Sequence, residues 1–181
     1  MKRIILAVVG GLSVATAAQA QTDAQLIEKA LMAAPANARE TAMVVKWSGN
    51  SHTTIREGTG LVCYDHSGAV GEQPFSVQCT DVGNLARVAQ NYQLEAAAAG
   101  NREALQASLA AAEANGTRVR PVFGSAWLSM TGADAATARR HTTIAVPGGT
   151  QASMGLPETR SPGAWIMNAG TSTAHIMVPG M

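Results

Sequence analysis

The chain has 181 residues, of which 46% are hydrophobic, 14% are charged and 4% are aromatic, and its formal net charge is +1 at pH 7. The basic residues are scattered and are not interleaved with aromatic residues, which excludes a basic nucleic-acid-binding surface of the usual kind. The low aromatic content also argues against carbohydrate recognition by stacking on aromatic platforms.

Residues 1–20 have the three parts of a secretory signal peptide. Lys2 and Arg3 form a positive start, an apolar run follows from Ile4 to Val14, and small residues occupy positions 18 and 20. The apolar run is shorter than the roughly 20 residues that span a bilayer, which argues against a membrane anchor. We predict cleavage after Ala20 and export by the Sec route to the periplasm or the medium, with no stable membrane insertion afterwards.

The mature chain, residues 21–181, is expected to form one domain, because its length suits a single core. Thr22 and Gln25 have the spacing of a helix capping box, and an apolar stripe follows until Pro35. From position 41 the apolar period changes to two. Three strands are predicted over residues 43–47, 52–56 and 61–64, joined by polar turns as a meander.

The chain has only two cysteines, Cys63 and Cys79, and they flank a polar stretch that contains glycine and proline. In an oxidising compartment they are expected to form a disulfide that closes a polar loop over residues 64–78. They lack the Cys-x-x-Cys spacing that is typical of redox sites.

An alanine-rich region from Asp81 to Asn115 predicts two helices, capped by Asp81 and Asn101 and ended by Gly100 and Gly116. Alanine faces bury little area, so this helical hairpin is expected to pack on a sheet. Strands are predicted again over 122–130, 142–146, 164–168 and 174–178, with a long connection at 147–163. The predicted fold class is α+β, with antiparallel strands before and after an alanine-rich helical hairpin and one disulfide.

Two blocks of the chain resemble a family of small exported bacterial proteins of unassigned function. The first block is Arg56-Glu57-Gly58-Thr59, followed by Gly60 and Cys63. The second is Trp165-Ile166-Met167, followed by Gly170-Thr171 and by the run from Ala174 to Pro179. The resemblance implies a shared fold and a shared cysteine loop, and it brings no catalytic residues.

The first block has two interpretations. Gly58 and Gly60 can adopt positive φ angles in a hairpin turn, with Arg56 and Glu57 beside them in solvent. Alternatively, Arg56 and Glu57 form a recognition turn, presented on a rigid loop near the disulfide. The turn is favoured, because glycine and threonine account for it without a ligand.

A possible metal site lies near the C-terminus, where His175 and Met177 are two apart on a predicted strand and therefore share a face. Imidazole and thioether together suit copper, with Met167 as a third candidate ligand and Met154, His141 and Met181 as further ones. A structural role is favoured, since methionine commonly fills gaps in protein cores.

We find no sequence motif for nucleophilic catalysis or phosphate binding, so no catalytic residue is predicted. We expect an exported, disulfide-containing binding or interaction module that needs no cofactor and whose partner is unknown. Two alternatives remain open: a copper-binding protein that uses His175 and Met177, and a small extracytoplasmic hydrolase with a site that its sequence does not reveal.

Overall fold

The computed structural model describes residues 21–178. The predicted signal peptide, residues 1–20, and the candidate ligand Met181 lie outside the described residues. Eight strands form one mixed sheet in the order β2-β1-β3-β4-β5-β6-β8-β7. The strands are β1 (Met43–Ser48), β2 (Ser51–Arg56), β3 (Leu61–Asp65), β4 (Phe75–Asp81), β5 (Ala126–Gly132), β6 (Arg139–Ala145), β7 (Trp165–Met167) and β8 (His175–Met177).

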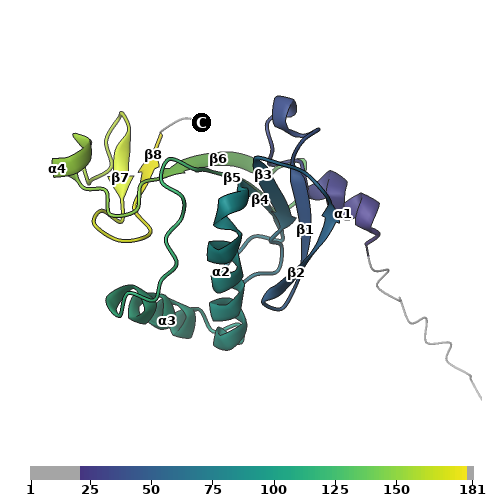
Figure 1. Ribbon diagram of the computed structural model, residues 1–181, viewed down its shortest axis with the longest axis horizontal. Coiled ribbons are helices and arrows are strands. Elements are labelled where there is room, and N and C mark those ends of the chain that lie inside the picture. The colour runs from purple at the N-terminus through teal and green to yellow at the C-terminus, as the bar shows by residue number, and fades with distance from the viewer. Residues whose placement is uncertain (1–20, 179–181) are drawn as a thin grey trace, which may run out of the picture.

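Four α-helices accompany the sheet: α1 (Asp23–Ala30), α2 (Leu85–Ala98), α3 (Arg102–Ala114) and α4 (Gln151–Met154). The capping box predicted for the first helix is confirmed, because Thr22 and Gln25 exchange hydrogen bonds between side chain and backbone. Asn101 caps α3, as predicted. Asp81 caps a short 3-10 turn that leads into α2. The α+β fold class with a helical hairpin between strands is therefore confirmed (Figure 1).

The two faces of the sheet carry different hydrophobic clusters. On one face, residues at the C-terminal end of α1 and directly after it pack with Val44, Val77 and the two cysteines. On the other face, Val88 of α2 packs with Val45, Val62 and Tyr64. Helix α2 thus lies against the sheet, as expected, whereas α3 extends away from it beside α2 (Figure 1).

The predicted three-stranded meander is wrong. β1 lies between β2 and β3, and it pairs with β2 in antiparallel and with β3 in parallel orientation. After β2 the chain therefore crosses the start of β1 before it enters β3, and Thr59 donates a backbone hydrogen bond to Thr41 O at 2.7 Å in this crossing. The cause is the segment 57–60, which is long enough to pass around β1 and does not form a tight turn.

Gly58 makes the crossing possible. A Cβ atom on Gly58 would lie 2.3 Å from Met43 N and 2.4 Å from Ala42 C. Gly60 has a φ of +74°, as the turn interpretation expects, but Gly58 is absent from the positive-φ glycines of the described chain. The first resemblance block is therefore explained by a close approach of two backbones at Gly58 and by a left-handed conformation at Gly60.

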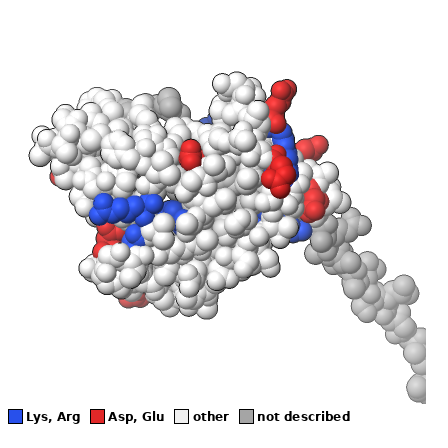
Figure 2. All heavy atoms as spheres, viewed as in Figure 1, with Lys and Arg blue, Asp and Glu red and all other residues white. Residues whose placement is uncertain are grey.

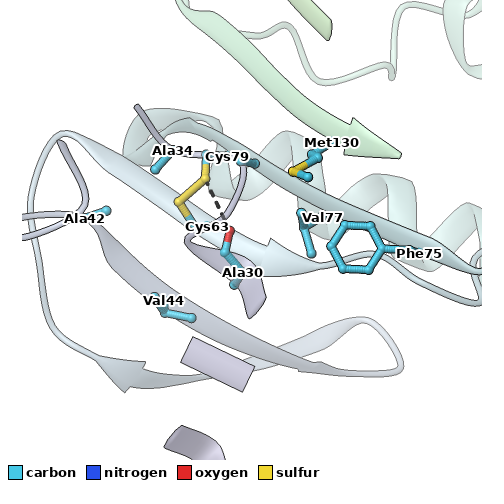
Figure 3. Packing of buried hydrophobic residues seen from close by; sticks show 10 residues of the cluster. Ala30, Ala34, Ala42, Val44, Cys63, Phe75, Val77, Cys79 and Met130 are labelled. Carbon is cyan, nitrogen blue, oxygen red and sulfur yellow. Dashed lines mark hydrogen bonds between the residues drawn. A yellow bond between two sulfur atoms is a disulfide. The ribbon is translucent and has the colours of Figure 1, made fainter. Parts of the chain in front are cut away.

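The predicted disulfide is confirmed. Cys63 and Cys79 are directly opposite residues of the antiparallel strands β3 and β4, with their Cα atoms 4.1 Å apart. Both cysteines are fully buried on the α1 face, and Cys79 Sγ lies 3.7 Å from the carbonyl oxygen of Ala30 (Figure 3). The crosslink therefore joins two central strands and lies in the core that α1 covers.

Strand β4 is not predicted from the sequence, because its residues are assigned to the polar loop and the helix that follows. The irregular part of the segment between the two cysteines is therefore shorter than predicted and spans residues 66–74, between β3 and β4. The long connection at 147–163 contains α4, and Met154 and Leu156 pack on a third cluster formed by Val146, Ile166 and Ala174. Within residues 21–178, no helix has the length and apolar character needed to cross a bilayer.

Candidate functional site

A pocket of about 440 Å³ lies between α2, the start of the loop after β3 and the hairpin that joins β1 to β2. This volume is within the range of small-molecule sites. Tyr92 and Glu95 of α2 form one wall, and Trp47 and Val45 of β1 form another. The remaining wall comes from Asp65 through Val70 and from Leu26 and Ala30 of α1.

Three of the chain's few large aromatic side chains meet at this pocket. Trp47 and Tyr92 are stacked, with ring centroids 4.4 Å apart and an interplanar angle of 13°. Tyr64 packs edge-on against both rings at 6.2 Å. Within the described residues, the buried indole N–H of Trp47 has no hydrogen-bond partner. An unpartnered buried donor is uncommon in folded proteins and marks a place where a ligand atom or a water molecule is expected to bind.

His66 is held at the base of the pocket by a chain of hydrogen bonds. The Tyr64 hydroxyl donates to Gln78 Oε1 at 2.9 Å, and Gln78 Nε2 lies 3.1 Å from His66 Nδ1. With the amide as donor, Nδ1 accepts and Nε2 carries the proton. His66 Nε2 then faces Glu95 Oε1 at 3.4 Å.

The pocket wall carries charges of both signs, from Asp65, Glu95 and Lys46, and Lys46 is paired with Asp23 at 3.5 Å. Asp65 is neutralised by Lys29, whose Nζ lies 2.7 Å away. Glu72 and Glu95 both face His66, at 3.6 and 3.4 Å, and neither has a lysine or arginine within 4.0 Å among the described residues. Burial, reinforced by these carboxylates, raises the pKa of both Tyr64 and Tyr92, which keeps the two phenols neutral.

The predicted recognition turn lies apart from this pocket. Arg56 is half-buried, and its Nη2 donates to the backbone carbonyl oxygen of Glu40. Glu57 is exposed. Neither residue lines the pocket. Ligand binding by Arg56 and Glu57 therefore stays a prediction. The hydrogen bond to Glu40 O gives Arg56 a structural role that needs no ligand.

The structure brings the three candidate copper ligands to one face of the sheet. Met167 and His175 are directly opposite each other on β7 and β8, and Met177 is two residues further along β8. Met154 does not join them, since it packs with the cluster around Ile166. His141 lines a second pocket together with His175. Among residues 21–178, no group of three or more His, Cys, Asp or Glu side chains is arranged to hold a metal ion.

Within residues 21–178, no serine hydroxyl is hydrogen bonded to a histidine ring. The nearest approach to a nucleophile with a base is Ser67, whose Oγ lies 2.9 Å from Lys29 Nζ. That hydroxyl donates to Ser76 O, and Lys29 is ion-paired with Asp65. The arrangement holds the loop to α1, and the hydrolase alternative stays untested.

Sequence reasoning missed the residues of the aromatic pocket. Trp47 falls in a predicted strand and Tyr92 in a predicted helix, and no motif or spacing in the sequence distinguishes His66. Comparison of the chain with protein-family models, with curated proteins and with solved structures finds no match. The resemblance to a family of exported proteins therefore stays a prediction.

Proposed function

We propose that the protein is an exported binding protein and that its ligand occupies the aromatic pocket beside α2. The observation that carries this proposal is a pocket of about 440 Å³ whose wall includes Trp47, a residue whose buried indole N–H has no hydrogen-bond partner among residues 21–178. A purely structural aromatic core would be filled, and its polar atoms would be paired. The buried disulfide supports an oxidising, extracytoplasmic compartment, where such bonds persist.

The charge of the pocket indicates the class of ligand. Glu95 lines the pocket and has no lysine or arginine within 4.0 Å among residues 21–178, and Trp47 and Tyr92 line the pocket with aromatic rings. Lys46, in the same wall, is already paired with Asp23. Aromatic rings with a nearby carboxylate favour organic cations, which gain from both the ring quadrupole and the negative charge. The ligand is therefore a small molecule with a flat apolar part and an ammonium group.

Tryptamine and indole-3-acetate test this proposal, because they share a ring system and carry opposite charges. Isothermal titration of the mature protein is expected to detect tryptamine binding and at least about tenfold weaker binding of indole-3-acetate. Glu95→Gln should weaken tryptamine binding by about tenfold, because it removes the charge and keeps the shape.

Glu57→Gln is the matched control, since Glu57 is equally charged, exposed and outside the pocket. It should leave tryptamine binding unchanged. Equal affinity for the two indoles, or equal loss in the Glu57 and Glu95 variants, would contradict the proposed ligand class.

A second candidate function is copper binding on the face formed by β7 and β8. The observation that favours it is the cross-strand pairing of Met167 with His175. His175 Nδ1 lies 2.7 Å from Thr173 O and donates to it, which leaves Nε2 available to bind a metal. A backbone carbonyl that orients a histidine in this way is typical of metal ligands.

Titration with Cu(I) in competition with a chelator tests the copper candidate. We expect micromolar or tighter binding, weakened at least about tenfold when His175→Ala and Met177→Leu are combined, because two of three ligands are lost. Met154→Leu is the control, because Met154 packs in a different cluster. Binding that survives the double substitution would rule out this site.

A further inference from the structure

Two arginines are buried on the α2 side of the molecule. Arg87 of α2 is 5% exposed, and Arg118, in the segment after α3, is 7% exposed. Taking a guanidinium out of water is costly, so buried arginines are normally paired with a carboxylate. The hydrogen-bond partners of Arg87 and Arg118 therefore show whether the two buried positive charges are paired.

All hydrogen-bond partners of the two guanidinium groups are neutral. Arg87 Nη1 donates to Val119 O and, at 3.3 Å, to Ser172 Oγ. Arg118 donates to Gln90 Oε1 at 2.6 Å and to Asn91 Oδ1. No carboxylate oxygen in residues 21–178 lies within 4.0 Å of either arginine, and Arg118 Nε has no partner there.

Two carboxylates lie near enough to affect the arginines, Glu113 both of them and Glu95 only Arg118, but neither is paired directly with a guanidinium in residues 21–178. Glu113 accepts from the Ser172 N–H and from the Ser172 hydroxyl, both at 2.5 Å. Burial and the charge of Arg118 lower the pKa of Arg87 to about 10, and Glu113 offsets only part of this effect. Neither guanidinium is therefore in direct contact with a carboxylate among residues 21–178.

A second pocket, of about 270 Å³, adjoins the pair and lies between α2 and strands β5, β6 and β8. Arg87 and Asn91 line it from the helix, and Thr143, Thr173, His141 and His175 line it with further polar groups. No aspartate or glutamate contributes to its wall. Figure 2 shows basic side chains between the C-terminal strands and α3, with acidic side chains next to them.

We propose that this second pocket binds an oxyanion, a phosphate or carboxylate group of a small molecule, with Arg87 as its main cationic contact. The anion supplies a directly bound counter-charge, which the described chain lacks, and threonine hydroxyls and the Asn91 amide complete its hydrogen bonding. Arg118 acts as a positioning residue, because it holds Asn91 against the pocket and adds a second positive charge.

Isothermal titration tests the proposal. The mature protein is titrated with inorganic phosphate and, separately, with succinate, and chloride keeps the ionic strength constant in both titrations. One of the two anions is expected to bind with a Kd below about 1 mM, and which one binds identifies the group. Arg87→Gln should weaken that binding at least about tenfold, because a charge-assisted contact is lost. Thr143→Val, a change that preserves shape in a strand, should weaken it about threefold to tenfold by removing one hydroxyl.

Arg120→Gln is the matched control, because Arg120 is exposed, lies in the same segment as Arg118 and does not line the pocket. It should leave the Kd unchanged. The proposal fails if neither anion binds, if Arg120→Gln weakens binding as much as Arg87→Gln, or if Thr143→Val, which is expected to fold normally, binds as tightly as the unchanged protein. None of these outcomes bears on tryptamine binding, which involves the other pocket.

Discussion

Gly58→Ala is expected to lower the free energy of unfolding by about 3 kcal/mol, because the added methyl group has no space. The new Cβ would lie 2.3 Å from Met43 N and 2.4 Å from Thr41 O, and backbone atoms cannot move aside as a flexible side chain does. To relieve this steric clash, β1 has to separate from the crossing segment, residues 57–60. That movement disturbs the pairing of Met43 with Val62 in β3. Urea unfolding followed by far-UV circular dichroism measures the change.

Gly60→Ala is the control for this prediction. Gly60 has a φ of +74° and nothing within 4 Å of its Cβ position, so alanine there meets only the conformational cost of about 1 kcal/mol. The two substitutions add the same atoms two residues apart. If both cost the same, close backbone approach at Gly58 is not what this block of sequence provides.

Replacing both Cys63 and Cys79 by alanine is expected to lower the free energy of unfolding by about 3 kcal/mol. The bond closes a loop with a sequence separation of 16 and restricts the unfolded chain accordingly. Both sulfur atoms are also fully buried, so their loss leaves space in the core that α1 covers. Chemical unfolding of the variant and of the unchanged protein, each with and without reductant, gives the comparison.

Reductant provides the internal control. It should destabilise the unchanged protein by a similar amount and should leave the alanine variant unaffected, since the variant has no thiols. A variant within about 0.5 kcal/mol of the oxidised protein would mean that the unfolded chain gains little freedom when the crosslink is absent.

Local structure was predictable wherever short-range chemistry decides it. The capping box at Thr22 and the Asn101 cap each depend on residues three positions apart, and both form as expected. The alanine-rich hairpin is similarly local. The disulfide was predictable for a different reason, because only two cysteines exist and one pairing is possible.

Strand pairing was not predictable, because it depends on partners far apart in the chain. Phe75, Val77 and Cys79 alternate in the manner of a half-buried strand, yet the polar residues between them resemble a loop. Ser76 and Thr80 are in fact fully buried, and Thr80 is satisfied by Ala126 O in β5. Their burial becomes explicable only when the neighbouring strand is known.

The candidate site depends on the same long-range arrangement. Trp47, Tyr64 and Tyr92 come from β1, β3 and α2, and no spacing in the sequence relates them. The low aromatic content of the chain gives no indication of this site, because a small number of aromatic residues can still be concentrated in one place. The buried arginines were equally hidden, because Arg87 occurs in a helix whose sequence resembles an ordinary amphipathic one.

Helix α2 separates the two pockets and forms a wall of each. Arg87 and Asn91 face the pocket beside β5, whereas Tyr92 and Glu95 face the pocket beside β1. If both proposed sites bind ligands, its 14 residues bear two sets of evolutionary constraints at once. A lineage that changed its ligand at one pocket would have to preserve the helix position for the other, so the sequence of α2 should diverge more slowly than that of α3, which lines neither pocket.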